Sequence, residues 1–429
     1  MMERYSEYKD SGVQWLGKIP SHWEVKRLAS CFTERKVKVS DKEFDPLSVT
    51  KNGIYPQLEN VAKTNDGDNR KLVLSGDFVI NSRSDRKGSS GVAKQDGSVS
   101  LINIVLKPRK NIYPDFCNYL LKCYSFIEEY YRNGRGIVAD LWTTRYDEMK
   151  TIKISVPLLN EQKAIVRYLN KVTSKIDEAI AQQQMMIDLL NERKQIIINN
   201  AVTKGLNPDV PMKSSGVDWI GEIPEHWELK KLKYICKAFG RIGFRGYSTT
   251  DLVNEGEGCI TLSPSNMVSG HMCYDSCTYL SWEKYEESPE IKIYNGDILF
   301  VKTGSTYGKS SLVEDLPMKA TINPQLLVLK YISCSTEYLS YVLQGKSIKY
   351  QIETSVIGGT IPTISQSKIL NYIITYPTIA EQVKIVAYIK DMILPIDNAI
   401  DIANRQITLL QERKQIIIND VVTGKVKVL

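Results

Sequence analysis

The stretch Glu-Arg-Lys-Gln-Ile-Ile-Ile-Asn occurs twice in this chain, at residues 192–199 and again at 412–419. With its neighbours it forms two 14-residue blocks that agree at 11 of 14 positions. A second pair of blocks, 11–24 and 215–228, is rich in Trp and Gly and agrees at 10 of 14 positions. Two matched pairs in the same order indicate an internal duplication, which decides the fold before any local structure is considered.

The offset between the two copies locates an insertion. Trp15 matches Trp219 at an offset of 204, whereas Glu161 matches Glu381 at an offset of 220. The second copy therefore carries 220 − 204 = 16 extra residues, which lie between positions 227 and 296. Between the matched blocks the copies barely resemble each other. The pattern is that of two constant frames holding two variable inserts.

Each copy predicts the same order of elements. Short apolar runs predict buried strands, at 71–74, 77–80 and 102–106 in copy one and at 298–301 and 326–329 in copy two. Apolar residues at helix spacing follow, at Phe116, Tyr119, Leu120, Cys123 and Ile127, and at Tyr338, Leu339, Val342 and Leu343. Each copy then closes with a strand that ends at Pro157 or Pro377 and with one long helix.

The long helix is predicted over 161–199, with apolar residues spaced near 3.5, as in a coiled-coil seam. The predicted seam is Ile165, Leu169, Val172, Ile176, Ala179, Met186, Leu190 and Ile197, with Gln183 and Arg193 off the pattern. The seam of copy two is predicted at Ile385, Ile389, Met392, Ile396, Ala399 and Leu410.

The ends of these helices carry their own signals. Asn160 is a predicted N-cap, and Thr378 with Glu381 forms a capping-box pattern. Gly205 and Gly424 stand where helix-ending glycines belong. Pro395 lies inside the second helix and predicts a kink or a break there.

A helix with one apolar stripe needs a partner, and the nearest partner is its own repeat. The predicted fold class is therefore α+β, with two pseudo-symmetric globular α/β domains separated by two long antiparallel helices that form a coiled coil. The alternative, in which each helix packs on its own domain, stays open. The predicted boundaries are 1–157 for the first domain, 158–204 for the first helix, 205–377 for the second domain and 378–429 for the second helix and tail.

Composition narrows the function classes. The 429 residues are 42% hydrophobic and 24% charged, which excludes a disordered chain or a simple rod. No apolar run approaches the roughly 18 residues of a membrane span, and the polar start predicts no secretory signal, so a cytoplasmic protein is expected. The 56 Lys and Arg residues exceed the 49 Asp and Glu residues by seven, and this net positive charge weakly favours a polyanion as binding partner. Three histidines leave little material for histidine chemistry.

Metal binding is not predicted. The eight cysteines include no CxxC pair, and the one cluster with zinc-ligand side chains is His271, Cys273 and Cys277. Because no second pair lies nearby and 271 and 273 alternate like one face of a strand, structural thiols are the favoured interpretation.

Three stretches of the sequence resemble catalytic motifs, but none matches its motif fully. Gly304-Ser305-Thr306-Tyr307-Gly308-Lys309-Ser310 has three residues between its glycines where a phosphate-binding loop needs four. The stretch at 323–326 lacks part of an amino-methyltransferase motif. Asp275, Glu290 and Lys292 fit a metal-dependent nuclease pattern only loosely. Catalysis within this chain is therefore not expected.

The repeated segments resemble those of type I restriction–modification specificity subunits. The resemblance rests on Trp15-Leu16-Gly17-Lys18-Ile19-Pro20-Ser21-His22-Trp23 with its repeat, and on Pro157-Leu158-Leu159-Asn160-Glu161-Gln162 with Pro377-Thr378-Ile379-Ala380-Glu381-Gln382. The stretch 296–305 and Ile361-Pro362 are similar to that family too, and copy one departs with Leu141-Trp142 at the latter place. The match covers nearly the whole chain.

The resemblance implies a non-catalytic subunit. Its two variable domains would be target-recognition domains that each read one half of a bipartite asymmetric DNA site. The paired helices would set the unread spacer and dock two modification methyltransferase subunits, and restriction (motor nuclease) subunits would complete the nuclease. This chain would hold no cofactor, whereas its partners would use S-adenosylmethionine, ATP and Mg. Two modules on a rigid spacer also fit two half-sites at a fixed distance.

DNA-contacting residues are sought among cations, amides and small polar residues in loops. The first loops considered follow the strands at 77–80 and 298–301, and the others are rich in Gly and Arg. The candidates are Arg83, Arg86, Lys87, Arg132, Arg135, Arg145, Arg241, Arg245, Lys302, Thr303, Ser305, Tyr307 and Lys309. The runs at 192–194 and 412–414 are predicted to be a solvated or partner-facing helix surface, and Trp15, Trp23, Trp219 and Trp227 to pack the frame.

Two other function classes remain as alternatives. A standalone two-domain DNA-binding regulator would bind a palindromic operator, which two unequal inserts argue against. A scaffold with no nucleic-acid role would show no salt-dependent DNA binding, whereas phosphate contacts make affinity fall steeply with salt.

Overall fold

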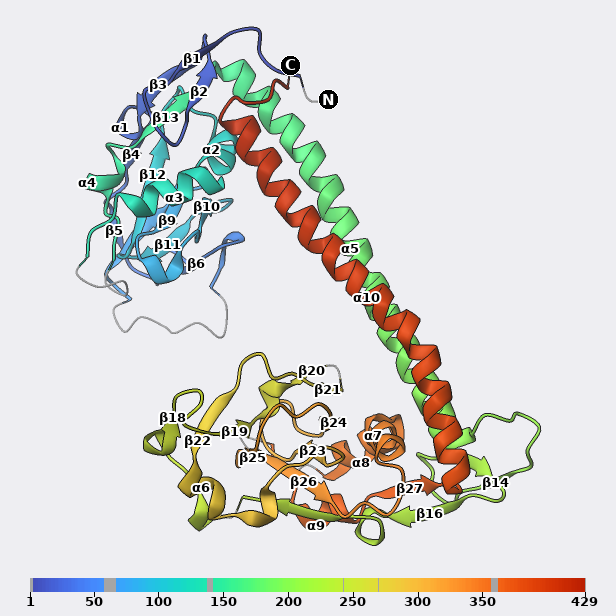
Figure 1. Ribbon diagram of the computed structural model, residues 1–429. Coiled ribbons are helices and arrows are strands. Elements are labelled where there is room, and N and C mark those ends of the chain that lie inside the picture. Colours follow the sequence, from blue (N-terminus) through green and yellow to red (C-terminus); the bar gives the residue numbers. More distant parts are fainter. Residues whose placement is uncertain are drawn as a thin grey trace. The chain divides into compact units, whose positions relative to one another are not determined.

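The computed structural model describes residues 3–57, 67–136, 142–241, 243–268, 270–355 and 362–428 (Figure 1). The chain divides into two compact units. Unit 1 comprises Met1–Gln184 with Asn404–Leu429, and unit 2 comprises Met185–Ala403. The units divide the chain differently from the four predicted segments, because each unit includes one end of both long helices.

Unit 1 is built around a four-stranded antiparallel sheet in the order β10-β9-β12-β4. Its strands are β4 (Phe32–Glu34), β9 (Phe78–Asn81), β10 (Ser90–Val92) and β12 (Asn103–Pro108). A second sheet has the order β11-β8-β5, from β5 (Lys38–Val39), β8 (Arg70–Val73) and β11 (Gly97–Ser100). The strand pairs are β1 (Tyr8–Asp10) with β2 (Lys18–Pro20), β3 (Glu24–Arg27) with β13 (Lys153–Val156), and β6 (Leu47–Thr50) with β7 (Gly53–Pro56). The short helices are α1 (Leu28–Cys31), α2 (Pro114–Leu120), α3 (Tyr124–Arg132) and α4 (Tyr146–Met149).

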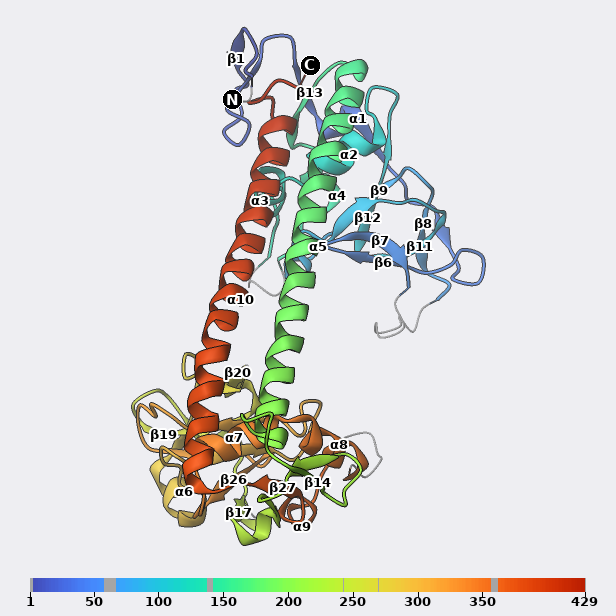
Figure 2. The same ribbon diagram turned by 90° about the vertical axis from the view of Figure 1, so that its right-hand side faces the viewer.

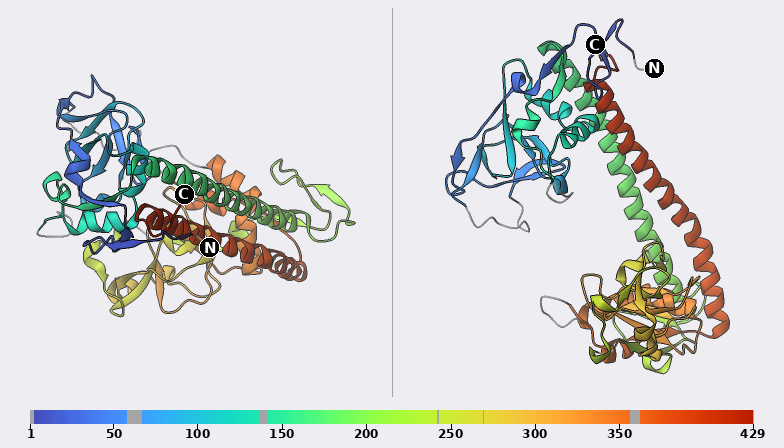
Figure 3. Two further views of the ribbon diagram at one scale, coloured as in Figure 1. Left: turned by 90° about the horizontal axis from the view of Figure 1, so that it is seen from above. Right: turned by 60° about the vertical axis from the view of Figure 1, so that its left-hand side comes forward.

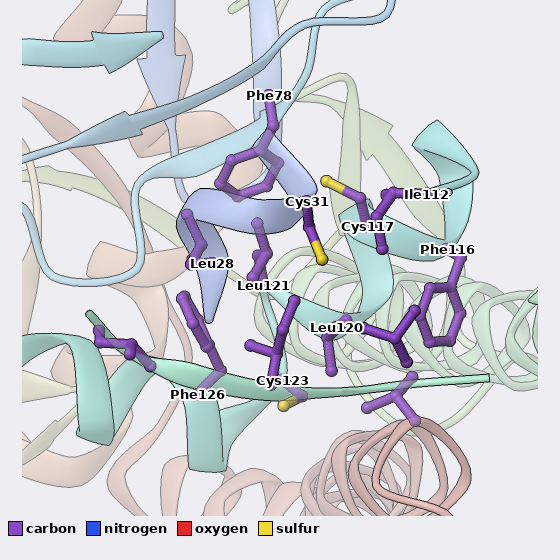
Figure 4. Packing of buried hydrophobic residues seen from close by; sticks show 14 of the residues in the cluster. Leu28, Cys31, Phe78, Ile112, Phe116, Cys117, Leu120, Leu121, Cys123 and Phe126 are labelled. Carbon is purple, nitrogen blue, oxygen red and sulfur yellow. The ribbon is translucent and has the colours of Figure 1, made fainter. Parts of the chain in front are cut away.

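The core of unit 1 lies between the four-stranded sheet and helices α2 and α3. Figure 4 shows Phe78 of β9 facing Cys31 and Cys117, with Phe126 of α3 on the other side of Leu28. The three cysteines of this core are buried and reduced, and burial raises the pKa of the Cys123 thiol to about 12. The predicted helical patch from Phe116 to Ile127 is confirmed as helix, but as α2 and α3 with a break at 121–123.

Unit 2 repeats the central sheet in the order β17-β26-β23-β24, formed by β17 (Lys237–Gly240), β23 (Ile298–Val301), β24 (Ser310–Leu312) and β26 (Leu326–Lys330). A second sheet, β18-β22-β19-β25, contains β18 (Leu252–Val253), β19 (Gly258–Leu262), β22 (Thr278–Ser281) and β25 (Ala320–Ile322), with β19 and β25 parallel. The pairs are β14 (Met212–Ser214) with β15 (Glu222–Pro224), β16 (Glu228–Lys231) with β27 (Ile373–Tyr376), and β20 (Met267–Val268) with β21 (His271–Met272). The short helices are α6 (Trp282–Glu286), α7 (Thr336–Gln344), α8 (Lys346–Ser355) and α9 (Gln366–Leu370).

The predicted strands of both copies are confirmed within one or two residues at each end. The equivalence also holds for the sheets, because β10-β9-β12-β4 and β24-β23-β26-β17 have the same order. The 16 extra residues of copy two fall in the region of β18 to β22. The insert therefore changes the second sheet and leaves the central sheet intact.

The two long helices are α5 (Leu159–Lys204) and α10 (Ile379–Val422). In each unit the two helices lie side by side (Figures 1 and 2), and the views in Figure 3 agree. They run antiparallel, since Asp177 pairs with Lys414 in unit 1 and Lys194 with Asp397 in unit 2. The predicted packing of each helix against its own repeat is confirmed.

The seam between the helices has an eleven-residue period. On α5 the buried isoleucines are Ile165, Ile176, Ile187 and Ile198, eleven residues apart. On α10 isoleucines stand at the matching positions Ile385, Ile396, Ile407 and Ile418. The predicted spacing of 3.5 is corrected over the second half of α5, where Met186 is 40% exposed and Ile187 is 6% exposed. Eleven residues in three turns is 3.67 per turn, a spacing that does not impose a left-handed supercoil.

The repeated Glu-Arg-Lys-Gln-Ile-Ile-Ile-Asn motif forms matched contacts in both units. The Lys194 amino group lies 2.7 and 2.9 Å from the two carboxylate oxygens of Asp397, and Lys414 lies 2.6 and 2.7 Å from those of Asp177. The prediction of a solvated surface is therefore wrong for Lys194, which is 9% exposed. The last residue of the motif accepts a bond from the first turn of α8 or α3, from Lys346 N to Asn199 and from Ser125 N to Asn419.

The Trp/Gly-rich segments fasten each globular part to the helix pair. In unit 1, Trp23 Nε1 and Tyr5 Oη donate to Glu161 Oε1 at 3.0 and 2.7 Å, and His22 Nε2 lies 3.0 Å from Glu161 Oε2. In unit 2 the equivalent contacts to Glu381 Oε1 are 3.3 Å from Trp227 Nε1 and 2.7 Å from His226 Nε2. Of the four tryptophans predicted to pack the frame, Trp23 and Trp227 are fully buried. Trp15 packs on Phe126, and Trp219 stacks on Tyr350 but is 39% exposed.

The same tryptophans contact the far ends of the helices. Gly424, at φ +79°, packs on Trp23, and Gly205, at φ +73°, packs on Trp227. Both glycines adopt the left-handed conformation that ends a helix and that other residues rarely adopt. Each tryptophan thus touches the start of one long helix and the end of the other.

Two predicted features of the helix ends and interior need correction. Helix α5 begins at Leu159, so Asn160 lies in its first turn and is not the N-cap. Thr378 does cap α10, since its hydroxyl and Glu381 exchange bonds with each other's backbone N–H. Helix α10 continues through Pro395, so the predicted break is wrong. The proline is exposed, and its neighbours Ile393 and Ile396 are buried, so packing on either side of it keeps the helix continuous.

Candidate nucleic-acid interface

In both units the loop after the central strand is tied to a returning segment by matched backbone bonds. The bonds are Ser84 N–H to Trp142 O (3.1 Å) and Thr144 N–H to Ser82 O (2.9 Å), and Gly304 N–H to Pro362 O (3.2 Å) and Ile364 N–H to Lys302 O (2.9 Å). Each position in one set lies 220 residues from its counterpart. Trp142 thus replaces Pro362 without changing the contact, while Leu141 and Ile361 lie outside the described residues. Loops held in this way present their side chains from a fixed base.

In unit 1 the structure brings Arg83 and Arg145 together. Both arginines are exposed, and both line a cavity of about 440 Å³ beside α4. Lys71 lies in the same cavity and donates to Asn103 O at 2.7 Å, and burial lowers its pKa. Among the described residues that line it, Glu34 is the one carboxylate. A cavity with three cations and one carboxylate suits a phosphate backbone.

A second cavity of unit 1 lies between the β6–β7 hairpin and the loop. Its volume is about 620 Å³, and Arg86 lines it with Lys51, Gln57 and Ser48. Arg86 also lies 3.6 Å from Asp85, an exposed pair of little energetic weight. The hairpin residues were not predicted as candidates, because a short polar hairpin has no motif that sets it apart from other loops.

The other candidates of unit 1 form surface ion pairs. Lys87 pairs with Glu128, Arg132 with Glu129 and Arg135 with Glu148. None of these three lines the two cavities described above. Exposed pairs contribute about 0–1 kcal/mol, so these side chains can exchange partners at little cost.

In unit 2 the equivalent loop lines a cavity of about 710 Å³ with strand β20 and the residues just before it. Thr303, Ser305 and Lys309 contribute from the loop, and Ser263, Ser265 and Gln325 contribute further polar groups. Lys302 is half-buried beside this cavity, and burial lowers its pKa. Tyr307 packs against the core of unit 2. The loop of unit 2 is thus richer in hydroxyl and amide groups, and that of unit 1 in arginines.

Two of the candidate arginines of unit 2, Arg241 and Arg245, form contacts within the protein. Arg241 is 5% exposed, and its guanidinium donates to Ile322 O (3.1 Å), Thr321 Oγ1 (3.0 Å) and Arg245 O (3.3 Å). Burial lowers the pKa of Arg241. Arg245 lies 3.4 Å from Glu290. The guanidinium of Arg241 thus already has backbone and side-chain partners, and contact of this residue with DNA stays a prediction.

The residues of the rejected catalytic patterns are placed apart or engaged elsewhere. Gly304–Ser310 connects β23 to β24 as a hairpin loop, without the helix that a phosphate-binding loop requires. Glu290 faces Arg245, and Lys292 forms an ion pair with Glu286. Within the described ranges, no three His, Cys, Asp or Glu side chains gather as metal ligands would. Likewise, among the described helices none is long and apolar enough to cross a membrane.

Comparisons with known proteins agree with these features. The model of the "Type I restriction modification DNA specificity domain" family matches twice, at residues 20–184 and 224–411. The MjaVIII type I restriction enzyme specificity subunit of Methanocaldococcus jannaschii is 25% identical over 449 residues, covering 100% of this chain and 98% of that protein. The putative MjaX specificity subunit of the same organism is also 25% identical, covering 96% of each.

A solved structure from a study of assembly and conformational transition of the type I R-M system has the same fold. It is 15% identical, covers 94% of this chain and 98% of that chain, and superposes with a TM-score of 0.65. The two family matches together cover well over half of the sequence, and they coincide with the two copies of the repeat. The chain belongs to the type I restriction–modification DNA specificity family.

Proposed function

We propose that each unit reads one half of an asymmetric bipartite DNA site, so that this chain gives a type I assembly its sequence specificity. The proposal rests on one observation: the two units share the same frame residues but present loops of different composition. Arg83 and Arg145 line the cavity of unit 1, whereas Thr303, Ser305 and Gln325 line that of unit 2. Different donors and acceptors select different base edges. Two unequal readers also argue against a standalone regulator with a palindromic operator.

The chemistry of modification and cleavage would come from partner subunits. We propose two methyltransferase subunits that dock on the helix pair, restriction subunits that complete the nuclease, and S-adenosylmethionine, ATP and Mg bound by those partners. Matched exposed aliphatic side chains on the helices support such docking. They are Leu189 and Leu409, at 60% and 62% exposure, and Ile196 and Ile416, at 43% and 60%. Exposed apolar side chains repeated on both helices are typical of a protein interface.

The direct test is to map methylated adenines in the host genome with and without this gene. We expect one asymmetric, gapped motif to lose its methylation when the gene is deleted. Restoring the gene with Arg83→Ala and Arg145→Ala should alter one half of the motif only. If every motif persists after deletion while a methyltransferase that copurifies with the chain is expressed, the proposal fails.

The eleven-residue seam allows a sharp test of the spacer. Because Asp177 faces Lys414 across the antiparallel pair, eleven residues inserted after Lys175 and eleven inserted after Gln415 would add one seam repeat to each helix. The isoleucines would stay in phase and both cross-helix ion pairs would be kept. The added length is about 16 Å, or roughly five base pairs. We expect the unread spacer to lengthen by about that amount with both half-sites unchanged. Altered half-site bases would sink the spacer role of the helices.

An insertion in α5 alone is the control. It would push Ile187 and Ile198 past their partners on α10 and separate Lys194 from Asp397. The unmatched variant should therefore lose stability and DNA modification together, whereas the matched variant should retain both.

A further inference from the structure

In unit 1 the corner between the 82–89 loop and helix α3 is closed. Lys87 Nζ lies 2.6 Å from Glu128 Oε1, so an ion pair joins the loop to α3. Gly88, next to this lysine, faces Ile127 of the same helix. The loop and α3 are thus in contact through both an apolar and a charged pair.

The equivalent corner of unit 2 is open. Tyr307 stands 220 residues after Lys87, and Gly308 faces Ile352 as Gly88 faces Ile127, which aligns Glu128 with Glu353. Glu353 therefore has no lysine opposite it, and within the described part of the chain it forms no ion pair. The loop and α8 still touch at Gly308 and Ile352, but among the described residues no ion pair joins them.

A cavity of about 530 Å³ occupies this corner. It is bounded by the 305–310 loop, by the end of α7 and one face of α8, by Gly270 next to β21, and by one turn of α5. The polar residues that line it are Asn191, Lys194, Gln195, Ser305, Tyr307, Lys309, Ser310, Gln344, Lys349 and Glu353. All of them belong to unit 2. The volume lies within the usual range of ligand sites.

The charges in the cavity favour an anion. Lys194 is neutralised by Asp397, and Lys309 donates one of its three N–H groups to Met267 O. Among the described residues of the lining, Lys309 and Lys349 therefore stand against one carboxylate, that of Glu353. Lys309 stands where unit 1 has the uncharged Ser89, since 89 + 220 = 309. The cation is therefore specific to this copy and is not part of the shared frame.

A buried hydroxyl in the same wall has no partner. Ser310 is 3% exposed, lines the cavity, and its Oγ forms no hydrogen bond with the described residues. The equivalent Ser90 of unit 1 donates to Gly88 O at 3.4 Å. An unpaired buried hydroxyl costs about 1–3 kcal/mol, so a ligand oxygen that accepts from Ser310 would be stabilising.

We propose that this corner cavity binds a phosphate group of the DNA backbone beside the half-site read by unit 2, through Lys309, Lys349 and Ser310. Ser305 and Lys309 also line the neighbouring cavity beside strand β20, so the corner continues the interface described above. The assignment rests on the proposed function. It adds an anchor on unit 2 that unit 1 lacks, because the Lys87–Glu128 pair fills that place there.

The first test measures how DNA affinity depends on salt, with full-length protein alone and with its copurifying subunits. Each phosphate contact contributes about 0.9 to the slope of log K against log salt. Because both lysines face one phosphate, we expect the double variant Lys309→Gln with Lys349→Gln to reduce the slope by about 0.9, so that between roughly 50 and 200 mM salt its affinity falls about threefold less than that of the wild type. Each single variant should reduce the slope by part of that amount. Lys284→Gln, which removes the same charge on α6, should leave the slope unchanged. Glu353→Gln should strengthen binding at low salt.

The second test uses duplexes with one neutral methylphosphonate at each backbone position in turn. For the wild-type protein, neutralising one position that flanks the unit 2 half-site should lower affinity by about the same factor as the double variant Lys309→Gln with Lys349→Gln. The double variant should be insensitive to that substitution. Equal losses of affinity at every backbone position would overturn the assignment.

Further outcomes distinguish failure of the corner assignment from failure of the proposed function. If wild-type protein binds DNA but Lys349→Gln and Lys309→Gln both match Lys284→Gln, the corner assignment fails alone. If the wild type shows no salt-dependent DNA binding, the proposed function fails. ATP is the probe for a free nucleotide, and its saturable binding, abolished by Lys349→Gln, would overturn the assignment to DNA.

Discussion

The contacts at the helix ends are made by the same residue types in both units, whereas the loops that these contacts support are held by different contacts. Gln162 Nε2 donates to Pro157 O and Gln382 Nε2 to Pro377 O, both at 2.9 Å. The loop corner of unit 1, by contrast, is closed by Lys87 and Glu128, and that of unit 2 is open. The comparison teaches that repeated residues are those with a role in joining sheet to helix. The residues that differ are those available to a ligand.

The largest expected effect tests whether the frame is equivalent in both units. Trp23→Ala and Trp227→Ala each remove a fully buried indole that bonds the glutamate at the start of a long helix. We expect each to lower the free energy of unfolding by about 3–5 kcal/mol. Trp219→Ala, at a residue 39% exposed, is the matched control and should cost much less. Urea unfolding measures all three, and a Trp227→Ala cost no larger than that of Trp219→Ala would break the equivalence.

A smaller difference is expected between the two cross-helix ion pairs. The Lys194 side chain is 11% exposed and its partner Asp397 38%, whereas Lys414 is 26% and Asp177 55% exposed. Asp397→Ala leaves a more buried ammonium unpaired and should cost about 2 kcal/mol. Asp177→Ala should cost less than about 1 kcal/mol. Thermal unfolding compares them, and equal losses would mean that burial does not distinguish the pairs. Lys194→Met with Asp397→Leu should recover most of the stability.

Breaking the Lys87–Glu128 ion pair should make the loop corner of unit 1 resemble that of unit 2. Glu128→Gln frees Lys87 at a cost of less than about 1 kcal/mol, because both side chains are 44% exposed. The released cation should steepen the salt dependence of DNA binding by up to about 0.9. Glu43→Gln removes a carboxylate elsewhere on unit 1 and is the control. An unchanged slope for Glu128→Gln would indicate that the corner of unit 1 does not face DNA.

The smallest effect concerns pH. Burial favours a higher pKa for Glu381, but hydrogen bonds from His226, Thr378 and Trp227 outweigh it and lower the pKa below its usual value. A carboxyl with a lowered folded-state pKa stabilises the fold above its unfolded-state pKa and loses that contribution as pH falls through the folded-state value. The difference in Tm between wild type and Glu381→Gln should therefore shrink as pH falls from about 6 to about 3.5. A constant difference would show that the charge of Glu381 is not involved.

Much of the fold follows from the repeat, but not the phase of the helix seam. The offset of 220 residues correctly aligns the strands, the ion pairs and the loop bonds of both units. The seam phase was missed because Met186 and Ile187 are both apolar, and because Ile196, Ile197 and Ile198 are consecutive. Only contact with the second helix decides which of them is buried.

The candidate site was harder to predict, because exposure of a loop cation depends on tertiary contacts. Arg83 and Arg145 are far apart in sequence, yet the returning segment places them in one cavity. Arg241 looks equivalent in sequence, but the carbonyl of Ile322 on β25 binds it internally. Lys349 had no local signal at all, since it sits on a helix whose role emerges only beside α5. DNA contact by any of these residues stays a prediction.

Helices α5 and α10 each run without interruption through both units. The α5 and α10 segments of each unit pair with each other, so unfolding of one unit would leave the helix pair of the other in place. At the boundary, however, both helices would gain a new end whose backbone groups lack their partners in the helix. The free energy of unfolding of one unit therefore includes fraying of helix turns that belong to the other, and the melting temperatures of the two units should be coupled although each unit has its own hydrophobic core.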